Sequence, residues 1–214
     1  MKSVIVLFGK PGAGKGTRLS EFLKGRENHF ESLGVSALLK KEIATGTELG
    51  KKAKFYMDAG LLVPDDLIIA MVLENLSGIN KPVFLDGFPR TIPQATAMLE
   101  AGIVPAMVLE FFLHDEIILE RVRDRIVCKT CGESYTIGNY KHPKVEGVCD
   151  LCGGTVVKRN DDREDIVLNR FEVYIKETYP LLDVFVKANV PIFTIDNSNS
   201  KAAAAQFEAL MEHF

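Results

Sequence analysis

The sequence predicts an α/β protein whose parallel sheet is flanked by helices. Along the chain, short apolar runs that are typical of buried strands alternate with segments of helical periodicity. Such alternation indicates parallel strands joined by right-handed crossovers. The first apolar run, residues 4–8, leads directly into the glycine-rich stretch GKPGAGKGT at residues 9–17. At 214 residues, the chain is long enough for one hydrophobic core and a small inserted unit.

The composition excludes several classes of protein. Apolar residues make up 47% of the chain, which is ordinary for a soluble globular protein. The net charge is only −3, so a general electrostatic attraction to nucleic acid is not indicated. No stretch approaches the length needed to cross a bilayer, and the apolar start is too short for a signal-peptide core. We therefore expect a cytoplasmic protein with neither a membrane nor a nucleic acid as partner.

The glycine-rich stretch after the first strand predicts a phosphate-binding loop. Gly9, Gly14 and Lys15 fit the pattern G-x-x-x-x-G-K, in which backbone N–H groups and the lysine surround phosphates. The helix that follows presents its N-terminus to the same anion. Gly16 comes next, so the expected hydroxyl lies one place late, on Thr17. The alternative, a glycine-rich turn with a chance lysine, does not explain the strand-loop-helix context.

The segment after the loop alternates further helices with one short strand. A helix is expected at residues 18–24 and a strand at residues 30–33. Two amphipathic helices then follow, and another starts at Pro64, where proline and acidic residues suit a first turn. This leaves a helical unit at residues 34–63 that could close over a ligand.

A second buried strand, at residues 82–85, ends in the stretch Asp-Gly-Phe-Pro-Arg. Ligands of such sheets lie beyond the carboxyl ends of the strands, so Asp86 and Arg90 should face the crevice that holds Lys15. A carboxylate and a guanidinium at one strand end suit a magnesium-phosphate ligand. The alternative is a surface turn that carries a salt bridge.

The next helix-strand-helix segment leads to a cluster of arginines. A helix is expected at residues 94–99 and a strand at residues 107–112. Asp115 starts a helix in which Arg121 and Arg125 are four residues apart, and therefore on one face. A solvated basic face usually explains such a pair, but the position just before the cysteines is also compatible with a phosphate role.

The last part of the chain completes the sheet. A long helix is expected at residues 164–176, a strand at residues 191–195 and a final helix at residues 202–214. With this strand, the expected strands number five, so we expect a five-stranded parallel sheet.

All four cysteines fall in two Cys-x-x-Cys turns that predict a zinc site. Cys128, Cys131, Cys149 and Cys152 have the spacing of a four-thiolate zinc ribbon. Four thiolates leave no open coordination position, so the metal should be structural. Free buried thiols are one alternative. A nucleic-acid-binding ribbon is another, but the insert lacks a dense basic flank.

Together, the loop, the stretch FLDGFPRTIPQA and the cysteine-bearing insert resemble the adenylate kinases, in the long-lid bacterial form with a zinc-binding lid. The resemblance covers nearly the whole chain. It implies a P-loop nucleoside monophosphate kinase fold and reversible phosphoryl transfer from MgATP to AMP, giving two ADP, in a monomer. It also divides the chain into a core of residues 1–33, 64–124 and 163–214, an AMP-binding helical insert of residues 34–63 and a zinc-binding lid of residues 125–162.

The resemblance also implies roles for individual residues. The expected ATP-binding residues are Gly12, Ala13, Gly14, Lys15, Gly16, Thr17, Arg121 and Arg125. The expected AMP-binding residues are Val35, Lys40, Gly87, Arg90, Gln94, Arg159 and Arg170. The residues expected to contact the transferring group are Lys15, Arg90, Arg125, Arg159 and Arg170. Asp86 matches the aspartate that holds Mg²⁺ through water.

One segment departs from the family pattern. Where adenylate kinases usually have Ser-Thr-Gly-Asp followed by an arginine, this chain has Gly-Val-Ser-Ala at residues 34–37 and then Lys40. A lysine can meet a phosphate as a point charge but cannot form the bidentate fork of arginine. We therefore expect a higher Michaelis constant for AMP than in a typical relative. Lys10 also replaces the small or apolar residue that is usual in the loop.

Two other functions remain as alternatives. The altered acceptor segment is compatible with a different nucleoside monophosphate kinase, one that acts on UMP, CMP or GMP, although the long lid and Gln94 favour AMP. A nucleotide-gated zinc ribbon that binds RNA would need a basic stripe and stacking aromatic residues. The lid offers only scattered tyrosines.

Overall fold

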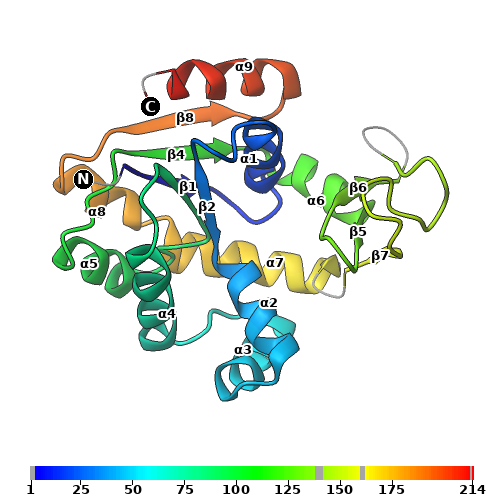
Figure 1. The fold of residues 1–214 in the computed structure, drawn as a ribbon, viewed down its shortest axis with the longest axis horizontal. Helices are drawn as coiled ribbons and strands as arrows, with labels where there is room; N and C mark the ends of the chain where they lie inside the picture. The colour runs from blue at the N-terminus through cyan, green and yellow to red at the C-terminus, as the bar shows by residue number, and fades with distance from the viewer. Residues whose placement is uncertain (1–2, 138–141, 160–161, 213) are drawn as a thin grey trace.

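A five-stranded parallel sheet forms the centre of the computed structural model, which describes residues 3–137, 142–159, 162–212 and 214. The strand order is β2-β3-β1-β4-β8, and every neighbouring pair runs parallel (Figure 1). The predicted fold class and strand number are therefore confirmed. The strands are β1 (Val4–Phe8), β2 (Glu31–Gly34), β3 (Val83–Asp86), β4 (Met107–Phe112) and β8 (Ile192–Asp196).

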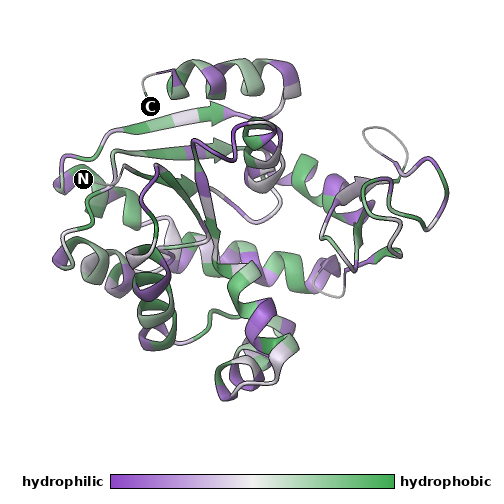
Figure 2. Cartoon of the chain, viewed as in Figure 1, coloured by the Kyte–Doolittle hydropathy of each residue, from purple (hydrophilic) through white to green (hydrophobic). Residues whose placement is uncertain are grey.

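The sheet buries both of its faces, because alternate side chains of a strand point to opposite sides. In β1, Val4, Val6 and Phe8 join one hydrophobic cluster, while Ile5 and Leu7 join the other. The first cluster includes residues of α4 (Asp65–Ser77), α5 (Ile92–Glu100) and α8 (Leu181–Lys187). The second includes residues of α1 (Lys15–Leu23), α6 (Asp115–Arg123), α7 (Glu164–Val173) and α9 (Ser200–Met211). Figure 2 shows the resulting band of hydrophobic residues along the central strands.

The connections after β1 and β3 leave the sheet on opposite sides. The chain runs from β1 into α1, which packs in the second cluster, and from β3 into α5, which packs in the first. Because these two strands are neighbours, their carboxyl ends lie side by side where the two connections diverge, and we call this place the crevice. This is the topological switch point at which ligands of open α/β sheets bind.

A pair of helices, α2 (Val35–Thr45) and α3 (Glu48–Asp58), projects from the core (Figure 1). Gly46 ends α2 with φ 70°, and the Thr47 side chain accepts a hydrogen bond from the backbone N–H of Gly50 to begin α3. A Cβ at Gly50 would lie 2.2 Å from the carbonyl oxygen of Glu42. The two helices therefore cross where only glycine fits.

The segment around the cysteines forms a second, antiparallel sheet, which projects at a different place from the core (Figure 1). Its strand order is β6-β5-β7, so the strand that enters this segment lies beside the strand that leaves it. The strands are β5 (Arg125–Cys128), β6 (Ser134–Thr136) and β7 (Val156–Lys158). We keep the name lid for this part of the chain.

One prediction about the arginines is wrong. Arg121 and Arg125 do not share a helix face, because α6 ends at Arg123 and Arg125 is the first residue of β5. Arg125 pairs with Thr136 of β6, so strand pairing in the lid overrides the helical periodicity of the local sequence.

The helical stretch near the C-terminus also differs from the prediction. In place of one α-helix over residues 164–176, α7 ends at Val173 and a π-helical turn, η2, covers Tyr174–Thr178. There, the N–H of Tyr179 donates to the carbonyl oxygen of Tyr174, five residues back. The short helix α8 follows and was not predicted. Among the described residues, no helix is both long and apolar enough to span a membrane.

Candidate active site

The phosphate-binding loop connects β1 to α1 at the switch-point crevice. Gly9, Gly12 and Gly14 all have positive φ values, of 128°, 86° and 91°, which non-glycine residues rarely adopt. A Cβ at Gly9 would also lie 2.4 Å from the carbonyl oxygen of Phe111. The Nζ of Lys15 donates to the carbonyl oxygens of Gly9 at 2.7 Å and Lys10 at 2.9 Å. The ammonium group thus lies over the loop, beside the N-terminus of α1, where an anion is stabilised.

Arg90 is held in place at the end of β3 by several groups. Its Nε donates to the carbonyl oxygen of Gly87 at 3.0 Å, and its backbone N–H donates to Oε1 of Gln94 at 2.8 Å. The Thr178 hydroxyl, from the π-helical turn, donates to the carbonyl oxygen of Arg90 at 2.8 Å. Gly87 has φ 83°, and a Cβ there would lie 2.7 Å from Nη2 of Arg90. Only glycine therefore allows the guanidinium to pack so close to the chain.

The pKa of Lys15 shows how many charges gather in the crevice. Burial lowers this pKa to about 8; the Asp86 carboxylate opposes the shift, and the guanidinium groups of Arg90, Arg170 and Arg125 add to it. Burial also lowers the pKa of Arg90, and Asp86 again acts in the opposite direction. The structure thus brings together five of the predicted site residues. Three guanidinium groups close enough to influence Lys15 make this a place that suits phosphate groups.

The lid arginines lie where the lid joins the core. Arg125 forms a fork with Asp162, in which Nε donates to Oδ2 at 2.8 Å and Nη2 donates to Oδ1. The Asp162 side chain is only 5% exposed, so this pair is shielded from solvent. Arg125 and Arg159 line a pocket of about 670 Å³ between α6, the lid and the start of α7, which Asp58 of α3 also reaches. Sequence reasoning did not assign a role to Asp162.

The predicted acceptor residues differ in their surroundings. Gln94 is 2% exposed, and its Nε2 donates to Asp65 at 2.7 Å while its Oε1 accepts from the backbone of Arg90. Val35 is buried in the core at the start of α2, and Lys40 lies exposed further along this helix. The roles of Gln94, Val35 and Lys40 toward a nucleotide stay predictions.

Arg121 lies beside the loop at Gly14, next to a residue that sequence reasoning missed. Its Nη2 donates to the carbonyl oxygen of Asn197 at 3.2 Å. Asn197 is 1% exposed, and its Nδ2 donates to the carbonyl oxygen of Ala13 at 2.6 Å. The available signal was its position two residues after the last predicted strand, at the sheet edge that carries the loop.

Asp86 has the chemistry and the position of a ligand for a hard cation. Its Oδ2 lies 3.7 Å from the place that a Cβ of Gly16 would occupy, which puts the carboxylate against the first turn of α1. Thr17, on the same turn, is exposed. Carboxylate and hydroxyl oxygens beside a phosphate-binding loop are groups that Mg²⁺ prefers, directly or through water.

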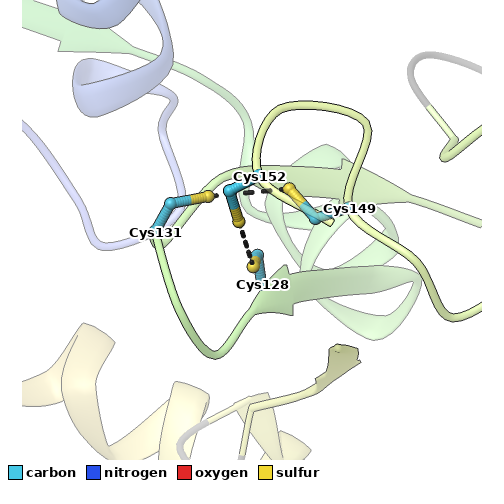
Figure 3. Close-up of side chains that lie close together, drawn as sticks. All are labelled: Cys128, Cys131, Cys149 and Cys152. Carbon is cyan, nitrogen blue, oxygen red and sulfur yellow. Dashed lines mark hydrogen bonds between the residues drawn. The ribbon is translucent and has the colours of Figure 1, made fainter. Parts of the chain in front are cut away.

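The four cysteines converge as their spacing predicted (Figure 3). All four sulfur atoms lie within 4.8 Å of one another, and the pairs Cys128–Cys152 and Cys131–Cys149 are separated by 3.5 and 3.6 Å. Tetrahedral zinc with bonds of about 2.3 Å would separate its sulfurs by about 3.8 Å. The donor set therefore fits zinc with little movement.

The buried side chain of Tyr135 contacts this cluster through its hydroxyl group. Its hydroxyl lies 3.3 Å from the sulfur of Cys149 and accepts a hydrogen bond from the N–H of Asp150 at 2.8 Å. Because the oxygen accepts from the backbone, its own proton is available for the thiolate. Such outer contacts orient the ligands of a metal.

Comparison with known proteins agrees with the geometry of the crevice and the lid. The family model for adenylate kinase matches residues 7–190. The adenylate kinase of Caldicellulosiruptor bescii is 45% identical over 187 residues, which span 85% of this chain and 86% of that protein. The adenylate kinase of Carboxydothermus hydrogenoformans is 41% identical over 202 residues, or 92% of each chain. That of Methanothrix thermoacetophila is 42% identical over 194 residues, or 87% of each chain. The chain therefore belongs to the adenylate kinase family.

Proposed function

We propose that this chain catalyses the reversible transfer of the terminal phosphoryl group of MgATP to AMP, giving two ADP. The observation that carries the proposal is that Asp86, Arg90, Arg125 and Arg170 all lie close enough to Lys15, at the switch-point crevice, to influence its charge. In the transfer, an oxygen of the AMP phosphate bonds to the γ-phosphorus, and the bond from this phosphorus to the β–γ bridging oxygen breaks. Family membership supports the same reaction.

The residues act by positioning and charge neutralisation. The acceptor oxygen already carries negative charge, so the protein need not supply a general base, and phosphoryl transfer asks for little covalent chemistry. The loop at residues 12–17 and Lys15 would hold the donor phosphates, and Arg90 would hold the phosphate of AMP. Arg125, Arg159 and Arg170 would provide charged forks for the transferring group.

The projecting units would exclude water, which is a competing phosphoryl acceptor. The helical unit at residues 34–63 would cover AMP, and the lid at residues 125–162 would cover ATP. Closure of such units also completes the set of arginines around the phosphates. Because Asp162 occupies the fork of Arg125 in this structure, a phosphate that binds Arg125 would compete with this carboxylate.

Two metals complete the proposal. Mg²⁺ would arrive with ATP and lie near Asp86, where it neutralises phosphate charge. Zn²⁺ would bind the four cysteines and stabilise the lid without contact to substrate. We also propose a cytoplasmic monomer, as in the family that the chain resembles.

A coupled assay of ADP formation from MgATP tests the function directly. AMP, GMP, CMP and UMP are offered separately, and we expect turnover with AMP alone. Turnover with another nucleotide in place of AMP would assign the chain to a different nucleoside monophosphate kinase. No turnover with any acceptor, from folded and zinc-loaded protein, would contradict the proposal.

The low pKa of Lys15 predicts a fall in donor use at alkaline pH. Only the protonated amine attracts phosphate, so kcat/KM for ATP should fall as pH rises through about 8, because kcat/KM reports the free enzyme. Lys15→Arg should lower kcat/KM but keep it level over this range, since arginine stays charged. The check is kcat/KM measured at a series of pH values, and a wild-type profile that stays level through this range would contradict the prediction.

Lys40 should set the affinity for the acceptor phosphate. We expect Lys40→Arg to lower the KM for AMP by roughly threefold to tenfold, because a guanidinium binds phosphate in a bidentate manner. The KM for ATP should not change. Lys41→Arg, the same substitution on the exposed residue next in the chain, is the matched control. An unchanged KM for AMP would remove Lys40 from the acceptor site.

A further inference from the structure

We propose that Asn197 is a positioning residue for the donor side of the active site, where it holds the phosphate-binding loop and Arg121 in a fixed relation. The inference rests on the proposed function. Asn197 directly follows β8, and three residues later the chain enters α9. It would contact no substrate itself but would act through two groups that bind ATP in the proposed function, the loop and Arg121.

Asn197 joins three separate elements of the core. Its Nδ2 donates to the carbonyl oxygen of Ala13 in the loop at 2.6 Å. Its backbone N–H donates to the carbonyl oxygen of Phe112, at the end of β4, at 2.9 Å. Its own carbonyl oxygen accepts from Nη2 of Arg121 at 3.2 Å. The side chain is almost completely buried, so these bonds are shielded from competing water.

The orientation of the Asn197 amide is fixed by its surroundings. If the amide were turned over, Oδ1 would face the carbonyl oxygen of Ala13 at 2.6 Å, and two acceptors would repel each other. In the observed orientation, Oδ1 is buried without a hydrogen-bond partner among the described residues. A buried acceptor in this state costs stability, which an apolar side chain would avoid. The contact that compensates is the bond from Nδ2 to the loop.

The loop is shaped to receive this amide. A Cβ at Gly14 would lie 2.2 Å from Nδ2 of Asn197 and 4.0 Å from Nη1 of Arg121. The absent side chain of Gly14 therefore makes room for Asn197, and the guanidinium of Arg121 lies beside the same position. A larger residue at Gly14 would displace the side chain of Asn197.

The bond to Ala13 has a consequence for the phosphate cradle. In a planar trans peptide, the C=O of one residue and the N–H of the next point in opposite directions. When Nδ2 of Asn197 holds the carbonyl of Ala13, it also fixes the direction of the N–H of Gly14. This N–H belongs to the loop that receives the donor phosphates. Asn197 thereby orients a donor to ATP and supports Arg121 with its backbone.

The test compares two asparagines of the same connection. Asn197→Ala should raise the KM for ATP about tenfold and leave the KM for AMP unchanged. Asn199, whose side chain accepts from the N–H groups of Lys201 and Ala202 to cap α9, supplies the control. Asn199→Ala should lower the melting temperature through loss of the cap but change neither KM. The split between donor and acceptor separates positioning from general destabilisation.

A second variant and a binding measurement keep the test decisive. Asn197→Asp keeps the size of the side chain but removes the Nδ2 donor, so titration calorimetry should also show ATP binding weakened about tenfold or more. If both Asn197 variants bind ATP as wild type does, or raise both KM values equally, the proposal is wrong. Failure of wild type to transfer phosphate to AMP would instead overturn the proposed function, and calorimetry would still test Asn197.

Discussion

We expect Lys15→Met to lower kcat for transfer from MgATP to AMP by about a thousandfold. Methionine keeps the length and apolar bulk of the lysine stem, so the fold should survive. The lost ammonium group is the one that lies over the loop, where charge shifts from the γ-phosphorus to the bridging oxygen during transfer. Loss of a preorganised charge at such a place is felt in the transition state more than in the ground state.

The expected signature is a large fall in kcat with a smaller change in the KM for ATP, measured by the coupled assay. Lys51→Met is the matched control, because Lys51 is exposed on α3 and pairs with Glu48 at the surface. It should leave kcat within about twofold of wild type, since surface ion pairs contribute little. A Lys15→Met enzyme with nearly normal kcat would exclude Lys15 from the transfer.

The second large effect concerns stability. Removal of zinc by a chelator should lower the melting temperature by roughly 5 to 10 °C and unfold the lid first. The reason is the small size of the lid core, which, among the lid residues that the structure describes, consists of Cys128, Tyr135, Cys149 and Val156 with Ile126 packed against it. Two of these four buried residues are proposed zinc ligands. Without the ion, the lid retains almost no hydrophobic core of its own.

Thermal denaturation, together with the rate at which a thiol reagent modifies the cysteines, measures this effect. All four thiols should react slowly in the zinc-loaded protein and rapidly after chelation. Added zinc should restore both readings, whereas the chelator should have little effect on Cys131→Ser, which lacks one ligand from the start. If chelation left both the melting temperature and the thiol reactivity unchanged, the cysteines would not be a structural zinc site.

The parts of the fold that the sequence predicted are those governed by local pattern. The apolar runs of β1, β3 and β4 predicted central parallel strands, because a strand covered on both faces needs apolar residues at successive positions. The loop was predicted because positive φ and close packing against Phe111 require glycine there. The cysteine cluster followed from ligand spacing alone.

The parts that the sequence did not predict depend on contacts between distant segments. Arg125 has helical spacing from Arg121, yet its pairing with Thr136 places it in a strand. The π-helical turn at Tyr174 places Thr178 against Arg90, 88 residues away. Asn197 bonds to Ala13 across 184 residues. Local periodicity carries no information about such pairs, which only the assembled core brings together.

The neighbouring positions of β5 and β7 have a consequence for how this protein can change over evolution. Ile126 pairs with Lys158, so the chain enters and leaves the lid at nearly one point. A segment joined to its host in this way can be replaced by one of different length or with different means of stabilisation, provided that its two ends lie equally close. The lid could therefore be exchanged as a unit. A lid from another family member could be grafted without a change in the strands that hold the phosphate-binding loop.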